Sequence, residues 1–93
     1  MAKQIWKFEI PTSDFLVTMP KDACVLSAGV QGQSVMVWAE VDPDVETVTR
    51  RFPVYGTGHK IDGKDASLRF VGTVFMGPFV WHVFDAGEQM AVH

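Results

Sequence analysis

The chain has 93 residues and a net charge of −3, with 47% hydrophobic and 20% charged side chains. This length allows one domain around one core, and the composition is that of a folded globular protein and not of a disordered one. The negative charge gives no general attraction to nucleic acid phosphates or anionic membranes, which argues against nucleic acid as a partner. We expect a single domain over residues 1–93, with residues 1–4 and 86–93 as loose termini.

The sequence holds one cysteine, Cys24. A lone cysteine excludes an internal disulfide framework and a cysteine-based zinc site, which fits a reducing cytoplasm. The first ten residues contain no apolar run of signal-peptide length, and nowhere do apolar residues continue over the ~20 positions of a membrane-spanning helix. We expect a soluble protein that stays inside the cell and has no membrane partner.

Two strands are expected near the N-terminus. Residues 5–10 alternate with the period of two that a half-buried strand needs, and Trp6 and Phe8 share one face. Residues 14–19 predict a short second strand or extended segment, which Pro20 stops.

The next stretch, residues 23–41, predicts a hairpin that turns at residues 31–33. One face of its two arms carries small and apolar side chains, namely Cys24, Leu26, Ala28 and Val30 on the first arm and Val35, Val37, Ala39 and Val41 on the second. We expect this face to be covered and the hairpin to form the centre of a sheet. Cys24 is then buried and chemically inert.

The second half of the chain predicts one more strand, a loop and a second hairpin. Residues 46–55 form the strand, and Pro53 cannot donate to a central ladder, so that part should lie at an edge or a bulge. Residues 56–65 are the longest polar interval and predict a loop. Residues 68–84 predict the hairpin, with a bulge or close approach at Gly72. The six or seven strands predict an all-β protein, a small antiparallel meander closed into a barrel or folded into a sandwich.

The most motif-like stretch is the Gly-Thr-Gly-His-Lys segment of the loop. Amides around glycines can form an anion-binding nest, arginines can add charge-assisted bonds, and an aromatic ring can stack on a base. A phosphate-bearing, nucleotide-like ligand would then contact Gly56, Thr57, Gly58, His59 and Lys60, with Arg50, Arg51 and Tyr55 or Trp38 beside them.

Simpler interpretations of the same residues have more weight. The stretch lacks the spacing of a P-loop and no helix follows it, so the glycines are expected only to let the chain turn. The two adjacent arginines are expected to form cross-strand salt bridges with Glu46 or Glu40.

No catalytic or metal-binding constellation is evident. The histidines at positions 59, 82 and 93 lack the HxH or HxxxH spacing that arranges metal ligands in advance. The aspartates at positions 42, 44, 62, 65 and 85 fall at expected turns, where exposed carboxylates do not acquire the raised pKa that paired-carboxylate catalysis needs. We predict that the protein is not an enzyme and has no metal or other cofactor.

The aromatic side chains are more than one small core hides. Trp6, Trp38 and Trp81 are the expected anchors of an interface with a protein partner. A domain of this size also gains stability by self-association, so we expect a homo-oligomer.

Several segments resemble, in order and over residues 5–84, a family of small uncharacterised proteins of tailed bacteriophages and prophages. These segments are IWKFEIP, MPKDACVLS, VWAEVDP, RRFPVYGTGH, FVGT and FVWHVF. The resemblance carries over no catalytic residue, and it implies a product made in the cytoplasm of an infected bacterium.

Small phage accessory proteins without an enzymatic constellation commonly work by binding. The resemblance therefore implies a non-enzymatic binding protein that counteracts a host or defence system, by sequestering a nucleotide-like ligand or by occluding a bacterial host protein. The alternatives are a structural, virion-associated β-protein and a protein-interaction module with no small ligand.

Overall fold

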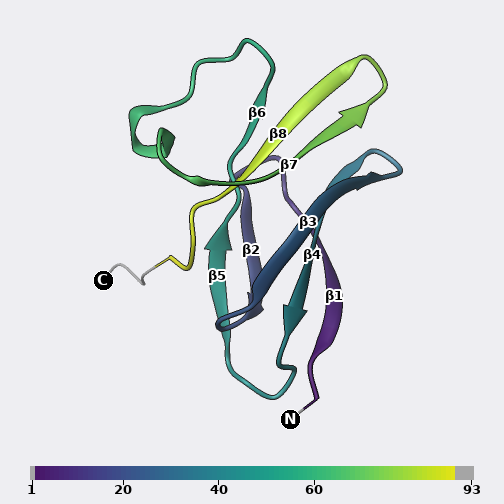
Figure 1. Ribbon diagram of the computed structural model, residues 1–93, viewed down its shortest axis with the longest axis vertical. Helices are drawn as coiled ribbons and strands as arrows, with labels where there is room; N and C mark the ends of the chain where they lie inside the picture. Colours follow the sequence, from purple (N-terminus) through teal and green to yellow (C-terminus); the bar gives the residue numbers. More distant parts are fainter. Residues whose placement is uncertain (1, 90–93) are drawn as a thin grey trace.

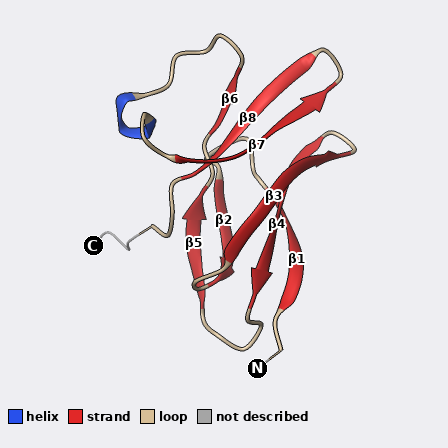
Figure 2. Cartoon of the chain, viewed as in Figure 1, coloured by secondary structure: helices blue, strands red, loops and turns tan. Residues whose placement is uncertain are grey.

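The computed structural model describes residues 2–89, which form an antiparallel all-β protein with one short 3-10 helix (Figures 1 and 2). In chain order the elements are β1 (Gln4–Glu9), β2 (Leu16–Pro20), β3 (Cys24–Gln31), β4 (Ser34–Val41), β5 (Thr47–Arg51), β6 (Val54–Gly56), the helix η1 (Gly63–Asp65), β7 (Arg69–Met76) and β8 (Phe79–Asp85). The strands form three sheets, in the orders β1-β4-β3, β2-β5 and β6-β8-β7. The all-β prediction is confirmed, and within residues 2–89 none of the three sheets closes into a barrel.

The strands lie in two regions of the molecule, one above the other in Figure 1. We call β1 to β5 the body, and β6, β8 and β7 the upper sheet. The hydrophobic core is shared by the two sheets of the body and is completed by residues between and beyond them, namely Ile10, Val17, Met19, Ala23, Val25, Val37, Ala39, Val41, Phe52 and Val83. Phe52 has no exposed surface and is the largest of these side chains.

The strand expected over residues 46–55 is two strands, because Phe52 and Pro53 interrupt it. β5 pairs with β2, whereas β6 pairs with β8, so the chain passes here from the body to the upper sheet. The Phe52 amide donates to the Phe15 carbonyl at 2.9 Å, and the Phe84 amide donates to the Pro53 carbonyl at 3.0 Å. The predicted disturbance at Pro53 is confirmed, and it raises the number of strands among residues 2–89 to eight.

The hairpin of β3 and β4 follows the prediction on one arm and departs from it on the other. On β4 the valines and Ala39 face the core as expected. On β3, however, Val25 is buried while Cys24 and Leu26 are exposed. The pairing register slips between Val25 and Ser27, and such a bulge moves the alternation by one residue. The prediction that Cys24 is buried is therefore wrong.

The second hairpin, of β7 and β8, is formed as predicted. Its register shifts between Phe70 and Gly72, which confirms the bulge expected there. A Cβ atom added to Gly72 would lie 3.5 Å from the Cβ atom of Ala28 on β3, so this point is also a close approach between the upper sheet and the body.

Residues 86–89 continue past β8 along β5. Two backbone hydrogen bonds hold them there, from the Ala86 amide to the Arg51 carbonyl at 2.9 Å and from the Gln89 amide to the Thr49 carbonyl at 2.8 Å. These residues are thus ordered against the body, in contrast to the expectation of a loose end. The remainder of that expected tail, residues 90–93, lies outside the described residues.

Candidate functional site

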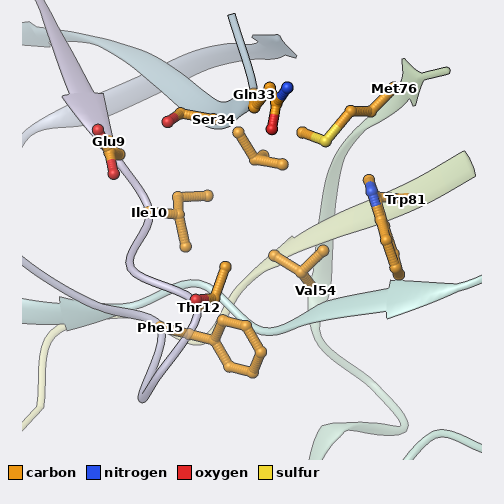
Figure 3. A pocket seen from close by; sticks show the side chains of 10 residues that line it. Glu9, Ile10, Thr12, Phe15, Gln33, Ser34, Val54, Met76 and Trp81 are labelled. Carbon is orange, nitrogen blue, oxygen red and sulfur yellow. The ribbon is translucent and has the colours of Figure 1, made fainter. Parts of the chain in front are cut away.

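A groove opens where the body meets the upper sheet, and it has a volume of about 450 Å³. This size is within the usual range of small-ligand sites. Its lining comes from both regions, with Glu9, Ile10, Thr12, Phe15, Gln33, Ser34 and Val35 from the body and Val54, Met76 and Trp81 from the upper sheet (Figure 3). The site is therefore built from segments that are far apart in the sequence.

Trp81 forms one wall of the groove, and two other rings lie against it. Trp81 and Phe79 are two residues apart on β8 and so share a face, which allows their rings to stack with centroids 5.6 Å apart and planes 16° from parallel. The His59 ring lies 6.4 Å from the Trp81 ring. Because Phe79 is 55% exposed, the apolar wall continues out of the groove onto the surface.

The imidazole of His59 is fixed by the backbone. Its Nδ1 atom accepts a hydrogen bond from the Gly56 amide at 3.2 Å. An accepting Nδ1 carries no proton, so the neutral ring holds its proton on Nε2. The predicted loop thus contributes to this site by holding a ring against Trp81.

Phe15 lines the groove next to Thr12 (Figure 3) and has a left-handed backbone conformation, with φ of 60°. For a residue with a bulky side chain this conformation costs about 1–2 kcal/mol. It is held by hydrogen bonds from the Phe15 amide to the Pro11 carbonyl at 3.1 Å and from the Phe52 amide to the Phe15 carbonyl at 2.9 Å. Strain of this kind is common at binding sites, where the surrounding structure determines the position of one side chain.

Polar side chains of the lining come from turns and strand ends of the body. Thr12, Gln33 and Ser34 supply hydroxyl and amide groups, and Glu9 is the one charged residue among the lining side chains. A carboxylate at this position repels phosphate and attracts a hydrogen-bond donor or a positive charge. The groove therefore suits an apolar group that carries donors and does not suit a nucleotide phosphate.

Arg50, one of the predicted phosphate ligands, is used inside the protein. Its Nε and Nη2 atoms donate to the two carboxylate oxygens of Asp85 at 3.0 and 2.6 Å, and its Nη1 atom donates to the Ala23 carbonyl at 2.7 Å. Both charged groups of this pair are largely buried. Arg50 thus joins β5 to β8 and to the start of β3, in place of the expected bridge to Glu46 or Glu40.

Arg51 and Tyr55 are also engaged, and both bind Asp65. The Arg51 guanidinium donates to one oxygen of this carboxylate at 2.5 Å, and the Tyr55 hydroxyl donates to the other at 2.6 Å. Tyr55 in turn accepts a hydrogen bond from the Asp62 amide at 3.3 Å. We call Arg51, Tyr55 and Asp65 the loop latch, because they fix the long loop between β6 and β7 to the sheets.

The loop latch changes the pKa of two of its members. Burial alone would raise the pKa of the Asp65 carboxyl, but hydrogen bonds from Arg51 and Tyr55 outweigh burial and hold this pKa below its usual range. The hydrogen bond to Asp65, together with burial, raises the pKa of the Tyr55 hydroxyl. At neutral pH, Asp65 is a carboxylate and Tyr55 a protonated donor. The expectation that Asp65 and Asp85 are exposed turn residues is therefore wrong.

The predicted anion-binding loop uses its own amides. The Gly56 amide donates to His59, the Thr57 amide donates to the Val80 carbonyl at 3.3 Å, and the His59 amide donates to the Gly56 carbonyl at 3.0 Å. Gly58 has φ of +88°, which fits the interpretation that it lets the chain turn. Lys60 is exposed. These amides do not form a nest, since three of them already have internal acceptors.

The three tryptophans do not form one surface. Trp6 is opposite the buried Ala39 and so faces the core side of the β1-β4-β3 sheet, at its edge, whereas Trp38 is opposite Lys7 and lies on the other face of that sheet. Trp81 lines the groove. Each tryptophan can therefore report on, or contribute to, a different surface.

Most of the groove was not predictable from residue patterns. Of the lining residues, only Trp81 was a predicted site residue, and His59 lies beside it outside the lining. Thr12, Gln33 and Ser34 occur in turns and at a strand end with no motif that marks them. The loop latch could have been predicted in part from the adjacent arginines Arg50 and Arg51, because each buried guanidinium needs a carboxylate partner.

Residues 2–89 lack the features of a metal site and of a membrane-spanning helix. In this range, no three side chains of His, Cys, Asp or Glu lie together in a way that could hold a metal ion. His82 is bound through its two ring nitrogens by the hydroxyls of Thr57 and Thr73, at 2.8 and 3.0 Å. No helix among these residues is long and apolar enough to cross a membrane.

The fold and the groove define a small antiparallel β-protein with an open, mainly apolar groove between its two regions. The chain belongs to the family described as a domain of unknown function, DUF7352, whose model matches residues 1–92. No curated protein and no solved structure matches the chain.

Proposed function

We propose that this protein is a non-enzymatic binding protein that holds a protein partner by accepting one of its apolar side chains in the groove. The observation that carries this proposal is the continuous apolar wall from Trp81 inside the groove to the exposed ring of Phe79. A partly exposed, stacked aromatic pair beside a concave apolar site is the usual form of an interface anchor.

The charges support a protein partner over a nucleotide. Arg50 and Arg51 are occupied by Asp85 and Asp65, and the charged residue of the groove is Glu9. A nucleotide phosphate would therefore meet an acid and no free arginine in the groove. A basic or donor group next to the apolar anchor of a peptide would instead be attracted to Glu9.

The biological setting follows from the resemblance to phage and prophage proteins, and we propose it on that basis. The protein would act in the cytoplasm of an infected bacterium and occlude a host or defence protein. A virion-associated structural role is the second candidate, and the exposed aromatic surface would then be a contact with another virion protein. The presence or absence of the protein in purified particles separates the two roles.

The test compares Phe79→Ala with Phe75→Ala. Both rings are on the same hairpin and well exposed, at 55% and 71%, but Phe75 is opposite Val80 and lies on the other face of the upper sheet. Tagged wild-type protein captures the partner from bacterial lysate, and calorimetry with the purified partner gives the dissociation constant of each variant. We expect Phe79→Ala to weaken binding roughly 10-fold or more and Phe75→Ala to change it less than about 2-fold.

A second variant tests the groove itself. Thr12 is exposed and lines the groove, so Thr12→Trp should fill the space without entering the core. We expect loss of binding with an unchanged unfolding transition. Equal binding by wild type, Phe79→Ala and Thr12→Trp would overturn the assignment of the groove.

A further inference from the structure

β1 is an edge strand, and half of its backbone groups point away from the sheet. The Ile10 amide donates to the Val35 carbonyl on β4 at 2.9 Å. In an antiparallel pair, alternate residues bond to the same neighbour, so Gln4, Trp6 and Phe8 also face β4. The amides and carbonyls of Ile5, Lys7 and Glu9 therefore point toward the open side of the sheet, where Figure 1 shows β1 at its margin.

The usual protection of an edge strand is missing here. Edge strands are commonly blocked by a lysine, a proline or a bulge. β1 has no proline, and its pairing with β4 is regular over all six residues. Lys7 is the lysine of this strand, but its Nζ atom donates to the Gln31 side chain on β3 at 2.6 Å. Its side chain thus reaches across β4, away from the open edge.

We propose that the open edge of β1 pairs in antiparallel fashion with β1 of a second copy of this chain, with Trp6 opposite Trp6 on the two-fold axis. In this register, the outward backbone groups of Ile5 meet those of Lys7 in the other copy. The β1-β4-β3 sheets of the two copies then join into one six-stranded sheet.

Charge selects this register from its neighbours. Lys3 forms an exposed ion pair with Glu40 of its own chain, at 3.8 Å. With Trp6 on the axis, Lys3 is also opposite Glu9 of the second copy, so each ammonium group lies between two carboxylates and the dimer gains two Lys3–Glu9 contacts. Moving the axis to Lys7 places two ammonium groups opposite each other, and moving it to Ile5 places Lys3 opposite Lys7. Shifting the pairing of the two β1 strands by one residue would place Gln4, Trp6 or Phe8 against the outward groups of the second copy. The backbone groups of these residues already bond β4, so this register would lack hydrogen bonds.

Trp6 supplies apolar contact at the centre. It is 36% exposed, and its Nε1 atom donates to the Gln4 side chain at 2.7 Å, so the ring is positioned along the strand. Residues opposite each other in a pair without mutual hydrogen bonds bring their side chains closest together. The two Trp6 rings would therefore contact each other across the axis. Glu9 also lines the groove, so both tests below are made on the chain alone, without a partner protein.

The first test is sedimentation equilibrium of the full chain at low salt, which gives the dimer dissociation constant. We expect the wild-type chain to be a dimer. Glu9→Lys should raise the dimer dissociation constant at least about 5-fold, and the double variant Lys3→Glu/Glu9→Lys should return it to within about 3-fold of the wild-type value. Glu46→Lys makes the same charge change at an exposed site of the body that is not on this edge, and it should have no effect. A monomer at every concentration would overturn the proposal, as would a double variant that dimerises no more tightly than Glu9→Lys alone.

The second test reads the register by disulfide formation in a Cys24→Ser background. Trp6→Cys places two thiols opposite each other, at a Cα separation within the range that a disulfide allows, whereas Gln4→Cys places each thiol opposite Phe8 of the other copy. With oxidised glutathione, Trp6→Cys should form a covalent dimer at least about 10-fold faster than Gln4→Cys. Equal rates, or a faster reaction of Gln4→Cys, would contradict the register. Circular dichroism of the reduced variants confirms that each one is folded.

Discussion

The body and the upper sheet are built from the same kind of strand, but they expose their phenylalanine side chains to very different extents. In the body, Val37, Ala39 and Phe52 have no exposed surface. In the upper sheet, Phe70 and Phe75 are exposed by 54% and 71%. The body has two sheets that share one core. The upper sheet has the body on one face, and on the other face the described part of the chain covers Tyr55 with the long loop but leaves Phe70 and Phe75 exposed.

The two regions also differ in what holds them. The body is held by apolar packing, while the long loop of the upper sheet is fixed by the buried charges of the loop latch. A sheet that keeps aromatic rings exposed gains less from burial and relies more on a few hydrogen bonds.

The largest effect is expected in the core of the body. Phe52→Ala removes the largest fully buried side chain at the point where the chain passes between the regions. We expect the free energy of unfolding to fall by about 3–5 kcal/mol, measured by urea denaturation. Phe75→Ala is the control from the upper sheet and should change it by less than about 0.5 kcal/mol. Similar losses in both variants would mean that the two regions do not differ as described.

The next effect concerns the loop latch. Asp65→Asn removes the charge that Arg51 pairs with and leaves this guanidinium without a counter-charge. We expect a loss of roughly 1–3 kcal/mol in the free energy of unfolding, with faster amide hydrogen exchange confined to the loop and β6. Asp62→Asn is the matched control, since Asp62 is exposed in the same loop. Fast exchange that extends into β4 would show that the loop latch supports the body as well.

A smaller effect is expected from acid. The pKa of Asp65 is below its ordinary value of 3.8, so the native state binds fewer protons than the unfolded state near this pH. The stabilisation by Asp65 is thus complete above about pH 5, where the carboxyl is ionised in the unfolded state as well, and it is lost as the pH falls through the lowered pKa. In urea titrations, the stability difference between wild type and Asp65→Asn should shrink as the pH falls from about 5 to about 2. A constant difference would contradict the assigned role of the carboxylate.

The smallest effect is spectroscopic. The chain has one tyrosine, so absorbance at the phenolate band reports Tyr55 alone. Because its pKa is raised above the ordinary value of 10.0, phenolate should form at a higher pH in wild type than in Asp65→Asn. The same midpoint in both proteins would show that Tyr55 does not donate to Asp65 in solution.

Local patterns predicted most of the strands but not their assembly. The alternation in β1 and β4, the break at Pro53 and the bulge near Gly72 are all local effects of side-chain period and backbone chemistry. The bulge at Leu26 has no glycine or proline to mark it, and this is why the burial of Cys24 was mispredicted. The position of this bulge is determined by how β3 pairs with β4 in the folded protein.

The site was predicted less well, for a physical reason. Arg50, Arg51 and Tyr55 have the chemistry of phosphate ligands, and the same chemistry suits Asp85 and Asp65, which are far from them in sequence. A pattern shows which groups can bind an anion, but not whether the anion is a ligand or a carboxylate of the same chain. Trp81 was predicted as an interface anchor because the aromatic residues are more than one small core hides, and the structure places it in the lining of the groove. Its role in binding a partner stays a prediction.

The central claim is that the partner binds at the groove, and the three tryptophan indole signals in an NMR spectrum test it most directly. Trp6 reports the edge of β1, Trp38 the outer face of the β1-β4-β3 sheet and Trp81 the groove. When the purified partner is added, we expect the Trp81 signal to shift or broaden while the Trp38 signal stays unchanged. A shift at Trp38 with an unchanged Trp81 signal would place the partner on the body and contradict the account.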